Sequence, residues 1–189
     1  MRLADPFSWL NEAVHKRALG GLIVLSILLM LAMGTLDRQI RTPEATFGVG
    51  SFELARTLEA SQRILASWDP TARIYVALSL GLDYLFLATY SLSIALACVR
   101  VAAALRSRSS GLANLGLWLA WGQLAAALLD AVENYALIRV LVGAQEAIWP
   151  GLAWACALPK FAIVALGLVY VLLGAPAALV LARREQRNT

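Results

Sequence analysis

Four long apolar stretches constrain the fold of this sequence more than any other feature. They cover residues 18–36, 74–104, 112–142 and 151–182. A transmembrane helix needs about 20 predominantly apolar residues, and each stretch is close to or above that length. The chain is 60% hydrophobic and 15% charged, whereas soluble domains are about 45–50% apolar and about 25% charged. We therefore expect an all-α, polytopic membrane protein: a four-transmembrane-helix bundle that forms one integral membrane domain over 1–189.

The segment 37–72, between the first two stretches, has a different character because it holds nine charged residues. Within it, residues 51–68 place apolar side chains at helical spacing. Ser51 is a suitable N-cap, and Glu53 suits the positive end of a helix. This pattern predicts one amphipathic helix in the first extracytoplasmic loop, either lying on the membrane surface or covering a cavity. Trp68 is expected to anchor it at the membrane interface, where tryptophan is enriched.

Basic residues gather on one side of the expected topology. Three groups flank the apolar stretches: Arg2, Lys16 and Arg17; Arg100, Arg106 and Arg108; Arg183, Arg184 and Arg187. The connection 143–150 contains neither Lys nor Arg. Because short cytoplasmic loops carry the excess of Lys and Arg, both termini are expected in the cytoplasm. The low lysine content and the abundance of Ala, Leu and Arg are typical of bacterial proteins, which favours the bacterial plasma (inner) membrane.

The expected partners follow from the same patterns. The basic residues form no stripe with interleaved aromatic residues, so nucleic acid is not an expected partner. The lipid bilayer is the expected surrounding of the four helices. Four helices are few for an alternating-access transporter, so conduction would require a homo-oligomer.

Ionisable residues inside the apolar stretches are the informative exceptions to this pattern. Asp83 lies in the second stretch, Asp130 and Glu133 lie in the third, and Lys160 lies in the fourth. A charge at mid-bilayer costs about 2.5–3.5 kcal/mol or more, so such residues face the interior and pair. At about 1.5 Å per helical residue, all four lie roughly 13–18 Å below the outer ends of their helices. We therefore expect them to meet in one site.

Helical spacing adds three further candidates to this site. Asn134 shares a helix face with Asp130 and Glu133, since the three are spaced i, i+3 and i+4. Gln123 lies on that face about two turns earlier. Tyr90 belongs to a polar stripe in the second stretch that also holds Ser79, Asp83 and Ser93. The predicted ligand-binding residues are Asp83, Asp130, Glu133, Asn134, Lys160, Tyr90 and Gln123, and the first stretch is expected to pack as a wall.

The function of this site is open between three hypotheses. The leading one is binding or movement of a cation, a proton or a small polar solute, because one ammonium cannot neutralise three carboxyls. The alternative is an intramembrane enzyme acting on a lipid or isoprenoid, with Asp130 or Glu133 as acid and base and Lys160 as electrostatic stabiliser. The third is a non-catalytic assembly subunit, in which Lys160 pairs with Asp83 or Glu133 only to fix helix register.

The residue types also limit the metal and cofactor chemistry. His15 is the only histidine and lies in the N-terminal segment, so the usual zinc ligand sets are not available within the spans. We expect no metal and no cofactor. An all-oxygen site for Mg²⁺ or Mn²⁺ built from Asp83, Asp130 and Glu133 is the alternative.

Overall fold

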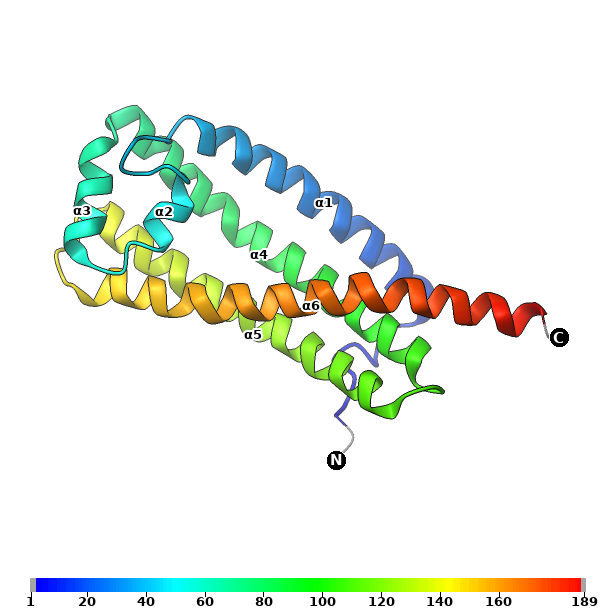
Figure 1. The fold of residues 1–189 in the computed structure, drawn as a ribbon. Helices are drawn as coiled ribbons and strands as arrows, with labels where there is room; N and C mark the ends of the chain where they lie inside the picture. The colour runs from blue at the N-terminus through cyan, green and yellow to red at the C-terminus, as the bar shows by residue number, and fades with distance from the viewer. Residues whose placement is uncertain (1–2, 188–189) are drawn as a thin grey trace. The chain divides into compact units, whose positions relative to one another are not determined.

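The computed structural model describes residues 3–187, with 177–187 as backbone alone, and within that range the chain is all-helical without a strand. The four long helices are α1 (Glu12–Arg38), α4 (Pro70–Leu105), α5 (Ser110–Leu141) and α6 (Ile148–Arg187) (Figure 1). Each is long and apolar enough to cross a membrane, α6 over Ile148–Pro176. The side chains of Arg2 and of residues 183–187, which entered the orientation argument, lie outside the described residues.

Polar side chains just before the long helices explain where these helices begin. The Asn11 side-chain oxygen accepts a hydrogen bond from the Val14 N–H at 2.9 Å at the start of α1. Asp69 accepts one from the Ala72 N–H at 2.7 Å, and Pro70 occupies the first position of α4. Free N–H groups at a helix start need such acceptors, and proline is favoured there because it has no N–H to satisfy.

The prediction of one helix over 51–68 is wrong, because this segment forms two helices. These are α2 (Val49–Glu53) and α3 (Leu58–Ser67). Between them Arg56 adopts a left-handed conformation with φ of 57°, which ends the helical path. Thr57 caps α3 by accepting from the Ala60 N–H at 3.2 Å. The expected cap Ser51 instead accepts from the Phe47 N–H at 3.0 Å and lies inside α2.

The contacts within the chain define two compact units. Unit 1 comprises Met1–Ile23, Tyr90–Ala126 and Phe161–Thr189. Unit 2 comprises Val24–Thr89 and Ala127–Lys160, and therefore includes α2 and α3. Each long helix contributes a segment to both units, and each unit has its own buried core.

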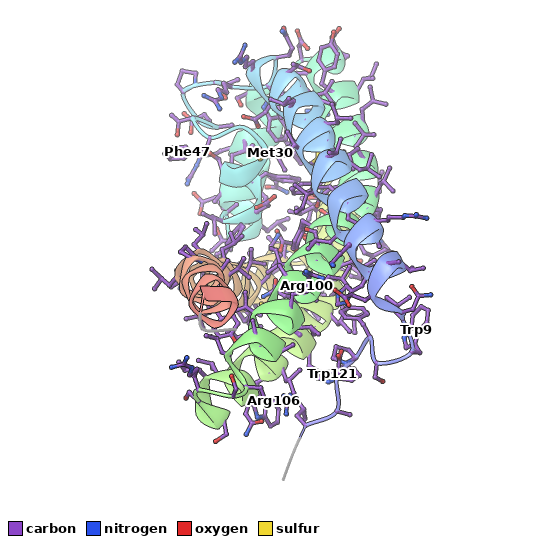
Figure 2. All side chains as sticks on the ribbon, turned by 90° about the vertical axis from the view of Figure 1, so that its right-hand side faces the viewer. Trp9, Met30, Phe47, Arg100, Arg106 and Trp121 are labelled. Atoms are coloured by element: carbon purple, nitrogen blue, oxygen red, sulfur yellow. The ribbon has the colours of Figure 1, made fainter. Side chains whose placement is uncertain are left out.

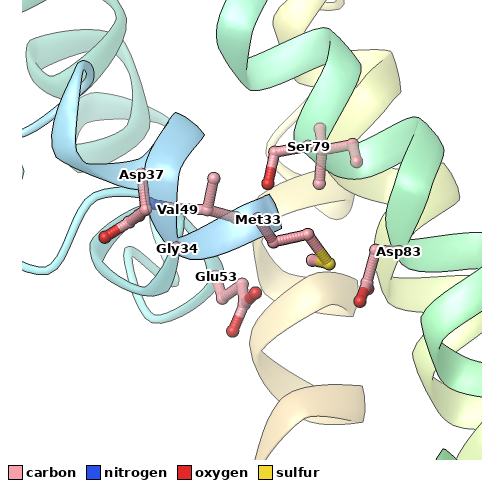
Figure 3. Close-up of a pocket in the computed structure, with 8 residues that line it drawn as sticks. Met33, Gly34, Asp37, Val49, Glu53, Ser79 and Asp83 are labelled. Carbon is pink, nitrogen blue, oxygen red and sulfur yellow. The ribbon is translucent and has the colours of Figure 1, made fainter. Parts of the chain in front are cut away.

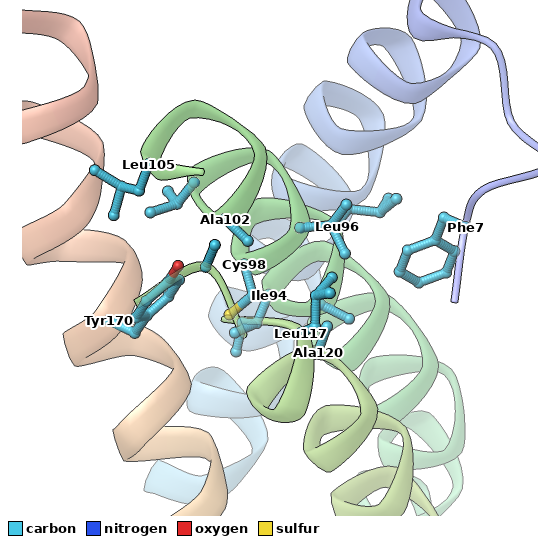
Figure 4. Close-up of a cluster of buried hydrophobic side chains, with 13 residues drawn as sticks. Phe7, Ile94, Leu96, Cys98, Ala102, Leu105, Leu117, Ala120 and Tyr170 are labelled. Carbon is cyan, nitrogen blue, oxygen red and sulfur yellow. The ribbon is translucent and has the colours of Figure 1, made fainter. Parts of the chain in front are cut away.

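The core of unit 1 is an apolar cluster from α4, α5, α6 and the segment before α1 (Figure 4). Its buried side chains include Phe7, Ile94, Cys98, Leu117 and Tyr170. The few polar groups there reach main-chain carbonyls: the Tyr170 hydroxyl donates to the Leu112 carbonyl at 3.0 Å. Small residues such as alanine allow these helices to approach closely.

The apolar core of unit 2 attaches the loop helices to α4 and α5. Phe52 of α2 and Trp68 pack edge to face, with ring centroids 5.4 Å apart. The indole N–H of Trp68 donates to the Ile40 carbonyl at 2.6 Å. Trp68 is therefore a buried core residue, and its predicted role as an interfacial anchor is wrong. Gln62 of α3 also bonds Gln145, so α3 lies beside the α5–α6 connection (Figure 1).

Large apolar side chains are exposed along α1 and in the loop that follows it. Only Leu29 of α1 is buried. Trp9, Met30 and Phe47 are among the exposed side chains (Figure 2). Soluble monomers rarely expose such continuous apolar surface.

Candidate functional site

A buried ion-pair cluster joins α5 and α6 within unit 2. The Lys160 Nζ lies 2.9 Å from Asp130 Oδ1 and 2.8 Å from Glu133 Oε2. The three side chains are 6%, 4% and 0% exposed, respectively. Asp130 and Glu133 reach the same ammonium because residues three apart lie on one face of a helix. Lys160 is thus held between two carboxylates.

A second buried pair joins α4 to α5 in the same unit. Asn134 Nδ2 donates to Asp83 Oδ2 at 2.6 Å. Glu133 contacts Lys160 and Asn134 contacts Asp83, and these two residues of α5 are adjacent in the sequence. Asp83 interacts electrostatically with both Asp130 and Lys160. The two pairs therefore belong to one electrostatic cluster, although Asp83 forms no salt bridge with any base whose side chain is described, from residue 3 to residue 176.

Two of the predicted site residues lie in unit 1. Gln123 is fully buried there and donates to the Ile163 carbonyl at 2.9 Å. Tyr90 belongs to the same unit. The other five predicted residues, Asp83, Asp130, Glu133, Asn134 and Lys160, all belong to unit 2.

Glu53, at the end of α2, is a site residue that the sequence reasoning did not select. It is half-buried and interacts electrostatically with Lys160 and Glu133. Burial raises the pKa of the Glu53 carboxyl above its ordinary value of 4.5; Lys160 opposes this shift, while Asp130 and Asp37 add to it. Local pattern could not identify Glu53, because a charged residue of a polar loop is ordinarily solvated. Its position depends on the packing of its neighbour Phe52 in the core.

A cavity of about 220 Å³ adjoins this cluster within unit 2 (Figure 3). It is lined by Met33, Gly34, Asp37, Val49, Glu53, Ser79, Leu80 and Asp83. The carboxylate of Asp37 is already engaged, since Oδ1 accepts from the Val49 N–H and Oδ2 pairs with Arg41, both at 3.0 Å. The polar groups that remain for the cavity are Glu53, Ser79 and Asp83.

Four buried side-chain polar atoms of α5 have no hydrogen-bond partner within the part of the chain that the structure describes. They are Gln123 Oε1 in unit 1, and Glu133 Oε1, Glu133 Oε2 and Asn134 Oδ1 in unit 2; Glu133 Oε2 is in ion-pair contact with Lys160. Buried polar atoms are ordinarily hydrogen-bonded, so each such exception calls for a physical explanation. The three in unit 2 belong to the cluster around Lys160 and Asp83, where acceptor oxygens outnumber donors. The site is therefore rich in acceptors and poor in positive charge.

The arrangement does not form a cage for a metal ion. Among residues 3–187, no group of three or more His, Cys, Asp and Glu side chains is placed to hold one. Asp130 and Glu133 converge on Lys160, and Asp83 is held by Asn134. The carboxylates are thus directed at protein donors. The geometry gives no support to the all-oxygen Mg²⁺ or Mn²⁺ alternative.

Comparisons with protein-family models, with curated proteins and with solved structures find no match for this chain.

Proposed function

We propose that this chain is a multi-pass integral membrane protein of the bacterial plasma membrane, with both termini in the cytoplasm. The support is the set of four long apolar helices together with the apolar side chains that α1 exposes. Lipid tails are the surroundings in which such a surface is stable. In this topology the segment with α2 and α3 lies outside the cytoplasm, and the α4–α5 connection lies inside.

Site-directed labelling tests this orientation. Single cysteines replace Glu59 on α3 and Arg108 in the α4–α5 connection, both exposed. Cys98 and Cys156 are buried and free, and they are replaced by alanine to remove the background. An impermeant thiol reagent applied to intact cells is expected to label position 59 and spare position 108. Labelling of both positions, or of position 108 alone, would overturn the orientation.

For the function itself, we propose that the acid-rich site of unit 2 binds a proton or a small cation. One observation carries this proposal: Asp130 and Glu133 contact the ammonium of Lys160, and Asp83 and Glu53 also interact with it electrostatically, so four carboxyls share one base. Two carboxylates take up the positive charge of Lys160, and the other two form no salt bridge with any base whose side chain the structure describes, over residues 3–176. Buried carboxyls without a counter-ion hold a proton or attract a cation, because an isolated buried charge is costly.

The other two hypotheses fit this charge distribution less well. A purely structural network would match its acids with bases, whereas Asp83 and Glu53 exceed what Lys160 can balance. The enzyme hypothesis needs Lys160 as an electrostatic stabiliser, but two carboxylates of the protein already offset its charge. Cation or proton binding uses the surplus acids and leaves Lys160 as an internal counter-ion.

The test is a proton and cation titration of the full chain in lipid nanodiscs. Potentiometric titration compares wild type with Asp83→Asn and with the control Glu59→Gln, whose side chain is 82% exposed. Sodium, potassium and ammonium chlorides are compared at equal ionic strength. We expect Asp83→Asn to remove a titration or cation response that lies outside the range of a solvated carboxyl, and Glu59→Gln to preserve it. Identical curves for wild type and Asp83→Asn, without any cation response, would refute the proposal.

A further inference from the structure

The polar lining of the unit 2 cavity includes a buried hydroxyl that no neighbour satisfies. Ser79 of α4 is 3% exposed, and its oxygen points into the cavity (Figure 3). It forms no hydrogen bond with the side chains and main chain described over residues 3–176. Thr89 and Ser93 on the same helix behave differently, since their hydroxyls donate to the Phe86 and Tyr90 carbonyls at 3.0 and 2.8 Å. The Ser79 hydroxyl is thus available to a ligand.

Asp83 lies one turn further along α4 and presents a fixed carboxylate to the same cavity. It is 8% exposed and lines the cavity beside Ser79, because residues four apart share a helix face. Asn134 holds its Oδ2, which fixes the carboxylate plane and leaves Oδ1 for another donor. Glu53 lines the cavity from α2. Three oxygen-bearing side chains from two helices therefore face one space.

The rest of the cavity lining is mainly apolar, so the cavity has a polar part and an apolar part. Met33 of α1 extends toward Asp83 (Figure 3), and Val49 and Leu80 complete this part of the wall. A protein cavity of about 150 Å³ holds a benzene-sized molecule, whereas a single water needs only about 10–15 Å³. A space of about 220 Å³ is therefore much larger than a bare ion requires. It suits a small organic molecule with one polar end.

We propose that this cavity binds a small organic primary ammonium, with its –NH₃⁺ group at Ser79, Asp83 and Glu53 and its carbon portion against Met33, Val49 and Leu80. A primary ammonium has three N–H donors, which matches three acceptor side chains. A metal ion would need a closer set of ligands, and no such set exists among the described residues. This inference rests on the proposed function and specifies the ligand of that site.

The ammonium has two possible sources that share this chemistry: a free amine, or the amine headgroup of a phosphatidylethanolamine-type lipid. The full chain is therefore prepared in nanodiscs of phosphatidylcholine and phosphatidylglycerol, and separately in nanodiscs that also contain phosphatidylethanolamine. Calorimetry measures binding of n-propylammonium and benzylammonium, with n-propanol, tetramethylammonium, Na⁺ and K⁺ as comparators. If the lipid amine occupies the site, free amines bind in the first preparation and lose affinity in the second. If a free amine is the ligand, both preparations bind it equally.

The inference predicts that primary ammonium ions bind at least tenfold more tightly than n-propanol and tetramethylammonium. Asp83→Asn is expected to weaken this binding at least tenfold, and Ser79→Ala severalfold. The matched control Ser93→Ala removes a hydroxyl that already bonds a main-chain carbonyl, so binding should not change. Met33→Phe fills the cavity and should weaken benzylammonium more than n-propylammonium; it keeps the test valid if Asp83→Asn does not fold.

Two outcomes would overturn the inference and separate it from the proposed function. If primary ammonium binds no better than n-propanol, while Na⁺, K⁺ or protons still respond to Asp83→Asn, the ligand class is wrong and the proposed function stands. If Asp83→Asn changes neither the amine binding nor the titration, both are wrong. Equal losses in Ser79→Ala and Ser93→Ala would also overturn the assignment, because the effect would then not belong to the cavity.

Discussion

The two compact units differ in the polar side chains that they bury. In unit 1 the buried polar side chains of Gln123 and Tyr170 are neutral, and each donates to a main-chain carbonyl. Unit 2 also buries neutral polar side chains, but it adds the ionisable ones of Asp83, Asp130, Glu133 and Lys160, and Lys160 meets Asp130 and Glu133 directly. A neutral donor such as an amide N–H or a hydroxyl needs only one acceptor, which a nearby main-chain carbonyl provides. A buried charge instead requires partners from other helices, which commits several elements to one site.

This contrast is the basis of the proposal that unit 2 binds a ligand. The core of unit 1 is formed by alanines, leucines and other apolar side chains packed against one another (Figure 4). Unit 2 has an apolar core as well, but it also has more buried acids than bases and a cavity that Asp83 and the half-buried Glu53 line. Excess acid is costly for stability alone. Its presence in one unit and not in the other is what points to binding.

The largest effect is expected when the single ammonium of unit 2 is removed. Lys160→Met leaves Asp130 and Glu133 buried without a counter-ion, and breaking such a pair costs about 3–5 kcal/mol. In unit 1, Gln123→Leu removes a neutral hydrogen bond and should cost about 1 kcal/mol. The free energies of unfolding are measured by denaturant titration in mixed micelles, followed by circular dichroism.

A rescue variant separates charge from packing in this experiment. Combining Lys160→Met with Asp130→Asn and Glu133→Gln removes the uncompensated charges and should restore most of the lost stability. If Lys160→Met costs no more than Gln123→Leu, the distinction between the two interiors fails. If the triple variant is as unstable as Lys160→Met, the cost comes from the shape of the side chain.

A second prediction concerns close packing between the long helices, and compares a glycine of unit 1 with a glycine of unit 2. A Cβ at Gly167 of α6 would lie 3.0 Å from the Ile94 Cγ2 and would collide with the Gln123 side chain. Gly167→Ala should therefore cost about 1–3 kcal/mol through overpacking. Gly81 of α4, in unit 2, has nothing within 4 Å of such a Cβ, so Gly81→Ala should be neutral or stabilise by up to about 1 kcal/mol. The same unfolding titration tests both, and equal costs would contradict the comparison.

The sequence was sufficient for the long helices, because their length and hydropathy are local properties. It also placed Asp130, Glu133 and Asn134 on one face, since that follows from helical spacing alone. It could not choose the partners of Lys160: Asp83 or Glu133 was expected, and the structure pairs Lys160 with Asp130 and Glu133. Depth along a helix does not reveal helix tilt or rotation, and these decide which carboxylate meets the ammonium.

The loop between α1 and α4 shows where sequence reasoning fails. Helical spacing over 51–68 suggested a continuous helix, but Arg56 interrupts it with a positive φ. Phe52 and Trp68 pack together in the core, which no local signal indicated. This packing brings Glu53 to the cavity. The position of Glu53 and the break in the helix at Arg56 were therefore not predicted for the same reason: tertiary packing overrides the local sequence pattern.

A third prediction uses pH to test the surplus acid of unit 2. Burial raises the pKa of Glu53, so the folded chain holds this proton more tightly than the unfolded chain does. The contribution of Glu53 to the free energy of unfolding is therefore greatest at pH values below the ordinary pKa of 4.5. It declines as the pH rises above that value. Glu53→Gln should remove that part of the decline in the free energy of unfolding. The control Glu59→Gln, on the exposed α3 surface, should leave the decline above pH 4.5 in place. If Glu53→Gln does not change the dependence of the free energy of unfolding on pH, Glu53 is not one of the unpaired acids of the site.

The smallest effect is expected at an exposed ion pair whose separation is similar to that of the Lys160 pairs. Arg63 Nη1 lies 2.7 Å from Glu59 Oε1 on α3, as close as the buried pairs, but the two side chains are 60% and 82% exposed. Exposed i, i+4 pairs contribute about 0.3–0.5 kcal/mol, because water screens them and the free side chains lose entropy on pairing. A double-mutant cycle with Glu59→Ala and Arg63→Ala should give a coupling in this range that falls with added salt. The corresponding cycle on Asp130 and Lys160 should give a several-fold larger coupling that salt barely changes. Comparable couplings would mean that separation alone sets the strength of these pairs, and burial would then no longer distinguish the charged interior of unit 2.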